Sequence, residues 1–279
     1  MDLKIIYLYC LCDDVLKLLS VKDSPQCRMR TAEIMTVGVV AALFYGGNIQ
    51  ASRQFLKLCN YLPNILSHSR LHRRLMAIPI EIWEAVFAIL KETLGSLFKA
   101  TDFVVDSCPL LACQPCRSWR CKLYNGKQYL GYCAAKKLQY YGLKIHLIVS
   151  EKGVIVEFLI TPASCADISA LKQMNIDLPD HAVLYGDRAY SSASFEAELQ
   201  EHTNITLIPQ RKRAAKNQHP GYLRYLQASK HKVVETVFSQ IARIMPRFFV
   251  VRTAKGLHLR IMLMLLAYTV DRFISNLTP

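Results

Sequence analysis

The chain has 279 residues, 52% of them hydrophobic, which is enough to bury the core of one large domain or two smaller ones. Lysine and arginine number 35 against 21 aspartate and glutamate residues, giving a formal net charge of +14. This excess argues against a cationic partner and favours a polyanion, most often nucleic acid; an anionic membrane would require a basic amphipathic helix, which is not evident.

The segment 1–19 has an apolar run like that of a signal peptide, but Asp13 and Asp14 interrupt it and no small-residue cleavage site follows. The longest other apolar runs, Ile34–Tyr45 and Ile261–Val270, are shorter than the roughly 18 residues of a membrane span. Without a secretion signal, the ten cysteines are expected to be reduced thiols. We therefore expect a soluble, cytoplasmic protein with no membrane partner.

Helical periodicity dominates residues 1–100, where the spacing predicts helices over 31–45, 50–61, 69–76 and 80–98. Thr31 is the expected N-cap of the first helix, and Gly46 ends it. The third helix is basic. Such a helix after a short turn is typical of a helix-turn-helix-like module whose cations meet DNA phosphates, whereas a solvated helix face is the alternative. We expect residues 1–100 to form a helical DNA-binding domain that contacts DNA through Arg70, Arg73 and Arg74.

Strand patterns begin near residue 101. Strands are predicted over 103–106, 142–150, 154–161, 182–185 and 205–209, and helices over 167–174, 191–202, 222–245 and 257–273. The segments 142–150 and 154–161 should pair as a hairpin, with His146 on the exposed side, whereas Ala182–Tyr185 is apolar throughout and should be buried on both faces. This order predicts a mixed α/β sheet flanked by helices. The polar segment 211–219 is expected to meet phosphates through Arg211, Lys212 and Arg213.

Three carboxylates follow or flank these elements. Asp106 closes the first predicted strand, and Asp187 follows the central one. The ends of adjacent central strands are neighbours, so these two groups should lie close together and repel unless a cation neutralises them. Glu235 lies at the edge of the apolar stripe of the helix 222–245 and can face the same strand ends. Oxygen ligands of this kind suit Mg²⁺, and a pair of such ions can promote phosphodiester displacement.

Each of the three carboxylates also has a structural alternative: an Asx turn before Pro109, a pair with Arg188, and a pair with Lys232 or Ser239, respectively. Asp102, four residues before Asp106, is the competing first ligand. Spacing leaves these alternatives open, because clustered carboxylates are also used structurally.

Five sequence blocks around these residues resemble one known family. They are DSCPLLAC with Asp106, YYGLKIHLIV, EFLITPASCADISAL, VLYGDRAY with Asp187, and KVVETVFSQI with Glu235. Together with AEIMTV and HSRLHRRL, they are similar to the DDE-type transposases of bacterial insertion sequences in the insertion sequence 982 group. The resemblance spans most of the chain, and the YGD-x-AY and VVET-x-FS blocks are its specific part.

The resemblance implies a ribonuclease H-like catalytic domain over residues 101–279, with a mixed five-stranded sheet flanked by helices. It implies that Asp106, Asp187 and Glu235 form the catalytic triad and bind Mg²⁺, with Mn²⁺ as an alternative and no nucleotide cofactor. The implied reaction is cleavage at transposon ends, the terminal inverted repeats, followed by strand transfer into target DNA. A homodimer on double-stranded DNA is expected, because two ends must be paired.

Around the glutamate, related families place a tyrosine, an arginine and a lysine at spacings that fall here on Ala228, His231 and Ala242. Lys232 and Arg243 lie one position away and are expected to contact DNA. Two alternative functions share the charge and the fold. One is a catalytically inactive or domesticated DNA-binding relative, and the other is a ribonuclease H-like nuclease that has no preference for terminal repeats.

Two further features lie close to Asp106 in the sequence. Four cysteines have the spacing C-x4-C-x2-C-x4-C, which contains one zinc-like pair but is too crowded to favour a zinc site over buried or loop thiols; they are Cys108, Cys113, Cys116 and Cys121. Trp119 and Tyr124 are interleaved with basic residues. That composition suits base stacking and phosphate contact, with a plain surface loop as the alternative.

Overall fold

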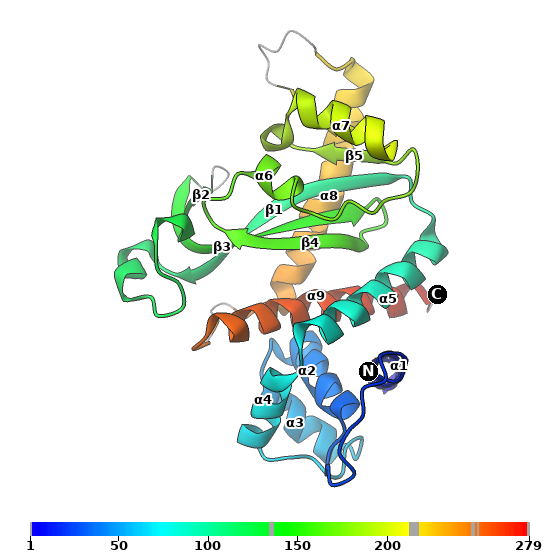
Figure 1. Ribbon diagram of the computed structural model, residues 1–279, viewed down its shortest axis with the longest axis vertical. Helices are drawn as coiled ribbons and strands as arrows, with labels where there is room; N and C mark the ends of the chain where they lie inside the picture. Colours follow the sequence, from blue (N-terminus) through cyan, green and yellow to red (C-terminus); the bar gives the residue numbers. More distant parts are fainter. Residues whose placement is uncertain (1, 134–136, 212–217, 247–248, 250, 278–279) are drawn as a thin grey trace. The chain divides into compact units, whose positions relative to one another are not determined.

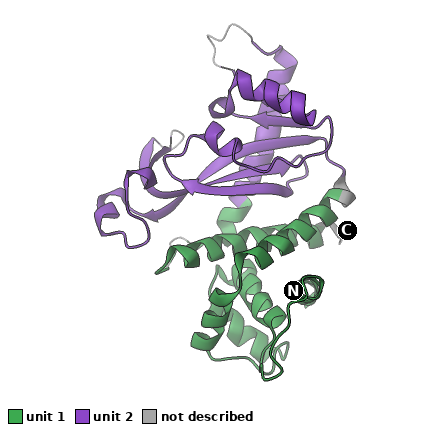
Figure 2. Ribbon diagram, viewed as in Figure 1, with its two compact units in different colours: residues 1–96, 240–279 green, residues 97–239 purple. Residues whose placement is uncertain are grey.

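The computed structural model describes residues 2–133, 137–211, 218–246, 249 and 251–277. The chain divides into two compact units, residues 1–96 with 240–279 (unit 1) and residues 97–239 (unit 2), which Figure 2 colours separately. The junction lies close to the domain boundary expected near residue 100. Residues 240–279, however, lie in unit 1, although the sequence pattern assigns them to the second domain.

Unit 1 is helical. Its helices are α1 Asp2–Leu18, α2 Thr31–Tyr45, α3 Ile49–Leu58, α4 His68–Ala77, α5 Ile80–Phe98, which runs past the unit boundary, and α9 Ala254–Leu277. The sequence pattern gives the bounds of α5 and the end of α2 correctly but misses α1. Helix α9 joins this unit because its central residues are apolar on every side and need a full covering of other helices. A methyl group on Gly38 of α2 would lie 3.3 Å from Leu263 of α9 and 3.1 Å from Leu75 of α4, so these helices pack closely.

The start of α2 differs from expectation. Arg30, and not Thr31, is the N-cap residue, and its backbone N–H donates to the Glu33 carboxylate in a capping box. Thr31 instead donates its backbone N–H and its hydroxyl to the Asp23 carboxylate, at 2.8 and 2.6 Å. The carboxylate of Asp23, in the preceding loop, therefore accepts a backbone N–H of the first helical turn, the role that an N-cap side chain usually has.

Across the described ranges, no single helix is long and apolar enough to cross a membrane. Helices α2 and α3 together reach the required length and hydropathy, but they are bent by 106° at the break between them.

Unit 2 contains a mixed sheet (Figure 1). Its strands are β1 Asp102–Cys113, β2 Leu130–Cys133, β3 Leu138–Ser150, β4 Ile155–Pro162, β5 Val183–Gly186 and β6 Thr206–Pro209. The strand order is β2-β3-β1-β5-β6, with β4 also paired to β3. Strands β1, β5 and β6 run parallel, and β3 and β4 form the expected antiparallel hairpin.

The sheet has six strands and not the five expected. The additional strand, β2, pairs with Leu138–Tyr141 of β3, whereas β4 pairs with Leu143–Val149 on the same edge. The two short strands therefore share one edge of a long β3. Strand β1 also continues well past Asp106, through Pro109. Proline is tolerated there because β5 pairs only with the first four residues of β1, which leaves the rest of that edge free.

Helices cover both faces of the sheet. Besides the strands, unit 2 contains α6 Asp167–Leu171, α7 Ala193–Thr203, α8 Gly221–Ile244 and the short 3-10 helices η1 Pro115–Arg120, η2 Lys127–Tyr129 and η3 Arg188–Tyr190. Helices α6 and α7 lie over one face and α8 over the other (Figure 1). The α6 and α7 face is packed around Val105, Leu184 and Phe195. The coverage buries His146 completely, contrary to the expectation of a half-exposed strand.

An ionic cluster joins α8 to the sheet. The Lys230 ammonium lies 2.6 Å from the Asp102 carboxylate on β1 and 2.6 Å from the Glu151 carboxylate in the β3–β4 turn. Burial lowers the pKa of Lys230, but hydrogen bonds to both carboxylates outweigh this effect and raise the pKa above its usual value. Asp102 is thus engaged with α8, which leaves Asp106 as the free carboxylate on that face of β1.

Candidate active site

Asp106 and Asp187 lie at the end of the parallel pair formed by β1 and β5. The last paired residues of this ladder are Val105 and Gly186, so each aspartate is the next residue along its own chain. Neighbouring strands are about 4.8 Å apart, which makes the two carboxylates neighbours. Val105 points into the α6 and α7 core, so Asp106 points to the opposite face, under α8. The structure therefore brings the first two predicted ligands to one edge of the sheet.

Both carboxyl groups are costly to ionise here. Burial raises the pKa of Asp106 to about 6; the Ser107 N–H, which donates to Oδ1 at 2.7 Å, and His231 lower it, whereas Asp187 and Asp167 raise it further. Burial also raises the pKa of Asp187, opposed by the Ala189 N–H, which donates to Oδ1 at 2.8 Å. The local donors therefore compensate only part of the negative charge at this edge.

His231 connects the third predicted carboxylate to the first. Its Nε2 lies 3.9 Å from Oδ2 of Asp106 and 3.6 Å from Oε1 of Glu235, which is one helical turn further along α8. The Glu235 side chain is 63% exposed, whereas that of Asp106 is 19% exposed. Helix α8 therefore presents Glu235 to solvent, one helical turn from the His231 ring that lies near Asp106. The sequence signal for His231 was its i,i+4 spacing from Glu235 on the same helix face.

On the other face of β1, Asp167 organises a second polar cluster, which the sequence pattern did not indicate. Ala166 is the N-cap of α6, and Asp167 is the first residue of this helix. Oδ1 of Asp167 accepts a hydrogen bond from the Ser107 hydroxyl at 2.9 Å and from the Lys144 ammonium at 3.2 Å. The Nδ1 atom of His146 lies 3.7 Å away, and burial lowers the pKa of this histidine to about 4. Asp167 thus fixes the side chain of Ser107, the residue that follows Asp106, by a hydrogen bond.

The YGD-x-AY block packs tightly behind the carboxylates. A methyl group on Gly186 would lie 3.1 Å from Cβ of Tyr190 and 3.2 Å from Cγ1 of Val105, so the absence of a side chain lets the Tyr190 ring approach the strand end. The Tyr190 hydroxyl is buried close to the Ser107 side chain. Burial raises the pKa of Tyr190 well above its usual value, and Asp167, Asp106 and Asp187 raise it further. This hydroxyl therefore stays neutral beside the carboxylates.

Within the described part of the chain, no three His, Cys, Asp or Glu side chains are close enough to form a ready-made metal site. The four cysteines near Asp106 are free thiols. Burial, followed by the neighbouring Cys121 thiol, raises the pKa of Cys113 to about 11, so this thiol is held protonated. The donors that follow the last paired residues of β1 and β5 are carboxylate oxygens, from Asp106 and Asp187.

The predicted DNA contacts differ in their surroundings. Arg70, Arg73, Lys232 and Arg243 are exposed. Arg74 is engaged within unit 1, since it donates to the Met29 carbonyl and pairs with Asp23 at 3.3 Å. In the same way, Arg211 pairs with Glu196 and donates to Ser191. Lys212 and Arg213 lie outside the described residues.

A basic pocket includes Arg188, the residue that follows Asp187. It is lined by Arg188, Arg211, Arg224 and His219, together with glutamines. Arg188 and Arg224 are both exposed, and within the described ranges neither forms an ion pair with a carboxylate. The sequence pattern indicated basic residues only from Arg211 onward, because Arg188 and Arg224 belong to different elements and meet only in the fold.

Residues 99–247 match the family model described as Transposase DDE domain. The match covers more than half of the chain and runs from just before β1 to just beyond α8, so it includes Asp106, Asp187 and Glu235. No curated protein and no solved structure matches the chain.

Proposed function

The chain belongs to the family of transposases with a DDE domain, and on this basis we propose that it is a DNA transposase that cleaves transposon ends and transfers the freed strand into target DNA. The observation that carries the proposal is the position of Asp106 and Asp187 directly after the last paired residues of β1 and β5, with His231 linking Asp106 to Glu235. Carboxylates from two strands and one helix, far apart in sequence, thereby share one edge of the sheet.

In this proposal Asp106, Asp187 and Glu235 hold Mg²⁺ or Mn²⁺, and the DDE transposase family normally uses divalent metals. Two observations fit a hard cation. The donors are carboxylate oxygens, and burial, with smaller contributions from neighbouring carboxylates, raises the pKa of both aspartates, so that a bound cation would offset the cost of ionising them. Such ions, when bound, supply charge neutralisation and activation for in-line displacement at phosphorus. No nucleotide cofactor is required, because strand transfer exchanges one phosphodiester for another.

The residues around the triad have supporting roles in the proposal. His231 orients Asp106 and Glu235, since its ring lies within 4 Å of both carboxylates. The basic pocket with Arg188 and Arg224 binds backbone phosphates next to Asp187, and exposed Lys232 of α8 adds a further cation in unit 2. Arg243, which is also exposed, is a separate proposed DNA contact. Because these groups are cations without carboxylate partners among the described residues, their interaction with DNA should weaken as the salt concentration rises.

We further propose that the exposed Arg70 and Arg73 of α4 bind the terminal inverted repeats and that the protein acts on DNA as a homodimer. The finer assignments belong to the same proposal: a ribonuclease H-like fold for unit 2, the insertion sequence 982 group, a bacterial origin and a cytoplasmic site of action. The mixed sheet with helices on both faces supports the fold assignment.

The test is strand cleavage of DNA that carries the inverted repeats flanking the gene. The full-length protein with Mg²⁺ should nick at the repeat ends and, with added target DNA, produce joined products. Asp187→Asn and Glu235→Gln should abolish both reactions while retaining DNA binding. Asp180→Asn and Glu201→Gln, which remove exposed carboxylates elsewhere in unit 2, are the matched controls and should behave as wild type. Undiminished cleavage by the triad variants would remove the assignment.

One observation favours a second candidate, a DNA-binding relative that does not cleave. Glu235 is largely exposed and meets Asp106 only through His231. That candidate predicts salt-dependent binding to the repeats without Mg²⁺-dependent nicking under any condition. Cleavage of unrelated DNA or RNA–DNA hybrids at equal rates would instead indicate a nuclease of the ribonuclease H type.

A further inference from the structure

The stretch of unit 2 between the sheet part of β1 and the start of β3 has a composition unlike the rest of the chain. We refer to residues 111–132, which comprise the end of β1, η1, η2 and β2, as the β1–β2 lobe. From Ser107 to Ser150 the sequence contains no aspartate or glutamate. Four cations of the lobe are exposed to solvent: Arg117, Arg120, Lys122 and Lys127. A surface with this charge fits an anionic partner and disfavours a second copy of the same lobe.

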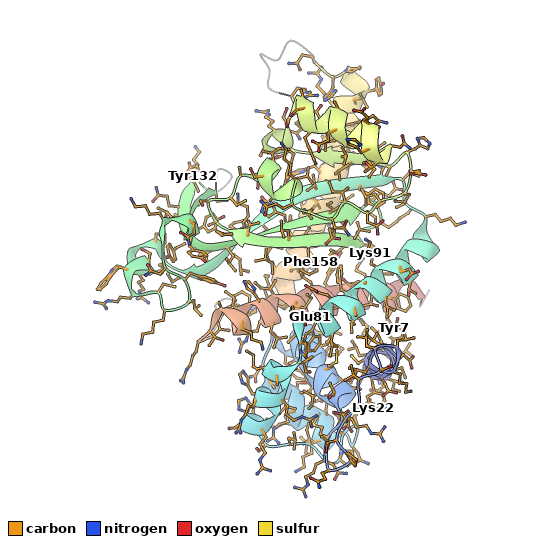
Figure 3. The ribbon with its side chains drawn as sticks, in the orientation of Figure 1. Tyr7, Lys22, Glu81, Lys91, Tyr132 and Phe158 are labelled. Atoms are coloured by element: carbon orange, nitrogen blue, oxygen red, sulfur yellow. The ribbon has the colours of Figure 1, made fainter. Side chains whose placement is uncertain are left out.

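The lobe also exposes large apolar side chains. Trp119 is 75% exposed and Tyr132 is 62% exposed; Tyr132 is labelled on β2 in Figure 3. Leu111 and Leu130 are exposed as well. Exposure of a tryptophan to this degree is unusual for a residue that packs well in cores, and aromatic side chains on a basic surface are the pattern with which proteins bind unpaired bases.

The Trp119 ring is held in place although it is exposed. Its Nε1–H donates to the Cys116 carbonyl at 3.1 Å, and the Arg120 guanidinium lies over the ring at 4.1 Å from its centroid. One face of the indole is therefore occupied by a cation. An oriented ring loses little conformational freedom on binding, which favours stacking of a flat ligand on the remaining surface.

The lobe has its own small aromatic cluster, formed by Tyr124, Tyr129 and Tyr141. Tyr124 is buried, contrary to the expectation that it takes part in stacking, and its ring centroid lies 4.5 Å from that of Tyr129. The Tyr141 hydroxyl donates to the Tyr124 carbonyl at 3.2 Å and so ties the lobe to β3. Tyr124 is therefore part of the packed interior of the lobe, whereas Trp119 is accessible to a ligand.

We propose that the β1–β2 lobe binds unpaired nucleotides of DNA, with Trp119 stacking on a base and Arg117, Lys122 and Lys127 contacting phosphates. This inference rests on the proposed action of the protein on DNA. Strand β1 continues from Asp106 to Cys113, with an irregularity in its pairing to β3 between Leu111 and Cys113, and this stretch spans about 23 Å at about 3.3 Å per residue. A DNA strand bound at Asp106 can therefore reach the β1–β2 lobe along β1 within a few nucleotides.

The two tryptophans of the chain allow a direct test, because Trp83 is fully buried in unit 1 and Trp119 is exposed. Full-length protein is titrated in EDTA, so that no strand is cut, with a single-stranded oligonucleotide, a blunt duplex and a duplex with unpaired ends. Trp119→Leu leaves only Trp83, so the difference spectrum isolates Trp119. We expect single strands and unpaired ends to quench the Trp119 emission, and the blunt duplex to leave it unchanged.

Affinity is measured in parallel by fluorescence anisotropy of labelled DNA. Trp119→Leu should weaken binding of the unpaired-end duplex about 5- to 150-fold, the range expected for one stacked base, without weakening the blunt duplex. Trp119→Tyr should restore most of this loss because it keeps a stacking ring. Leu18→Ala, which removes another exposed apolar side chain in α1, is the control and should bind as wild type.

The remaining outcomes separate the inference from the proposed function. If the protein binds duplex DNA but Trp119→Leu binds unpaired ends as tightly as wild type, the inference is wrong and the transposase proposal stands. If no DNA of any form binds, both are wrong. If anionic lipid vesicles quench Trp119 and single-stranded DNA does not, the lobe is a membrane-binding surface and the inference is overturned.

Discussion

The imidazole of His231 lies 3.9 Å from the Asp106 carboxylate, although His231 is on helix α8 and Asp106 is on strand β1, directly after the residues of β1 that pair with β5. The same ring nitrogen lies 3.6 Å from Glu235. A single side chain thus relates two carboxylates of the proposed triad.

Replacing His231 tests this relationship. His231→Ala should lower the rate of Mg²⁺-dependent cleavage about 10- to 100-fold, the usual cost of removing a group that orients metal ligands, with little effect on DNA affinity. His231→Arg should retain more activity than His231→Ala, because a guanidinium can donate to both carboxylates. Single-turnover cleavage measures the effect, and Ser229→Ala, exposed two residues earlier on α8, is the matched control. A rate unchanged by His231→Ala would show that the ring has no orienting role.

Asp106 should make the metal-free protein less stable at neutral pH. Its pKa is about 6 when folded and 3.8 as an ordinary carboxyl, so the folded state holds the proton more tightly. The free energy of unfolding should therefore fall as pH rises from about 4 to about 6, by about 2–3 kcal/mol. Asp106→Asn has no ionisable carboxyl at this position and so lacks this contribution to the pH dependence of stability. In EDTA it should match wild type near pH 4 and be more stable above pH 6.

Thermal denaturation across this pH range measures the effect. The Asn variant leaves the ionisable neighbours of Asp106 unchanged; they are His231, Asp187 and Asp167. Asp180→Asn, on the surface, should show a difference from wild type that does not vary with pH. An Asp106→Asn protein that is less stable than wild type at pH 7.5 would contradict the assigned cost of burial.

Divalent metal should stabilise unit 2 through the same carboxylates. At a Mg²⁺ concentration of about 100 times Kd, the folded state gains about 2.7 kcal/mol, which raises Tm by several degrees. Asp187→Asn should lose most of this Tm shift, because it removes one of the three proposed carboxylate ligands and leaves only those of Asp106 and Glu235. Ca²⁺, which is larger, should also bind but without supporting cleavage. An equal Mg²⁺ shift in wild type and Asp187→Asn would exclude Asp187 as a ligand.

The pair of Lys144 and Asp167 should behave as a coupled structural unit. Asp167→Asn leaves the Lys144 ammonium, whose side chain is 15% exposed, without its carboxylate, and this should cost about 1–3 kcal/mol of stability. Lys144→Met combined with Asp167→Asn should recover part of the loss, since no charge is then left buried alone. Urea denaturation of the two single variants and the double variant gives the coupling. Strictly additive losses would mean that the two groups do not interact.

The sequence predicts most elements of this protein because the information is local. The apolar spacing gives the bounds of α5 and the end of α2, and the alternation of β3 and β4 across a glycine turn gives the hairpin. Strand β2 was missed because Leu130–Cys133 is only four residues long and half of it is exposed. Helix α1 was missed because its apolar start resembles a targeting segment, which hides its periodicity.

The proposed site was predictable in part. Carboxylates that follow strands can be recognised in a sequence, and so can an i,i+4 pair such as His231 and Glu235. The cluster of Asp167 with Ser107 and Lys144 could not, because its three members come from a helix and two strands whose register is set by the whole sheet. The burial of Tyr124 and the exposure of Trp119 likewise depend on how the lobe folds onto β3.

Charge, apolar periodicity and residue type are properties of the sequence alone. They were sufficient to predict a polyanionic partner, a helical region followed by a mixed α/β region, and the three candidate acidic residues. Only the tertiary structure decided that Asp106 faces α8 while Ser107 faces α6, and that Asp102 is taken up by Lys230. The physical reason is that strand alternation and register assign neighbours in sequence to opposite faces. The partner of each side chain is therefore determined by the packing of distant elements.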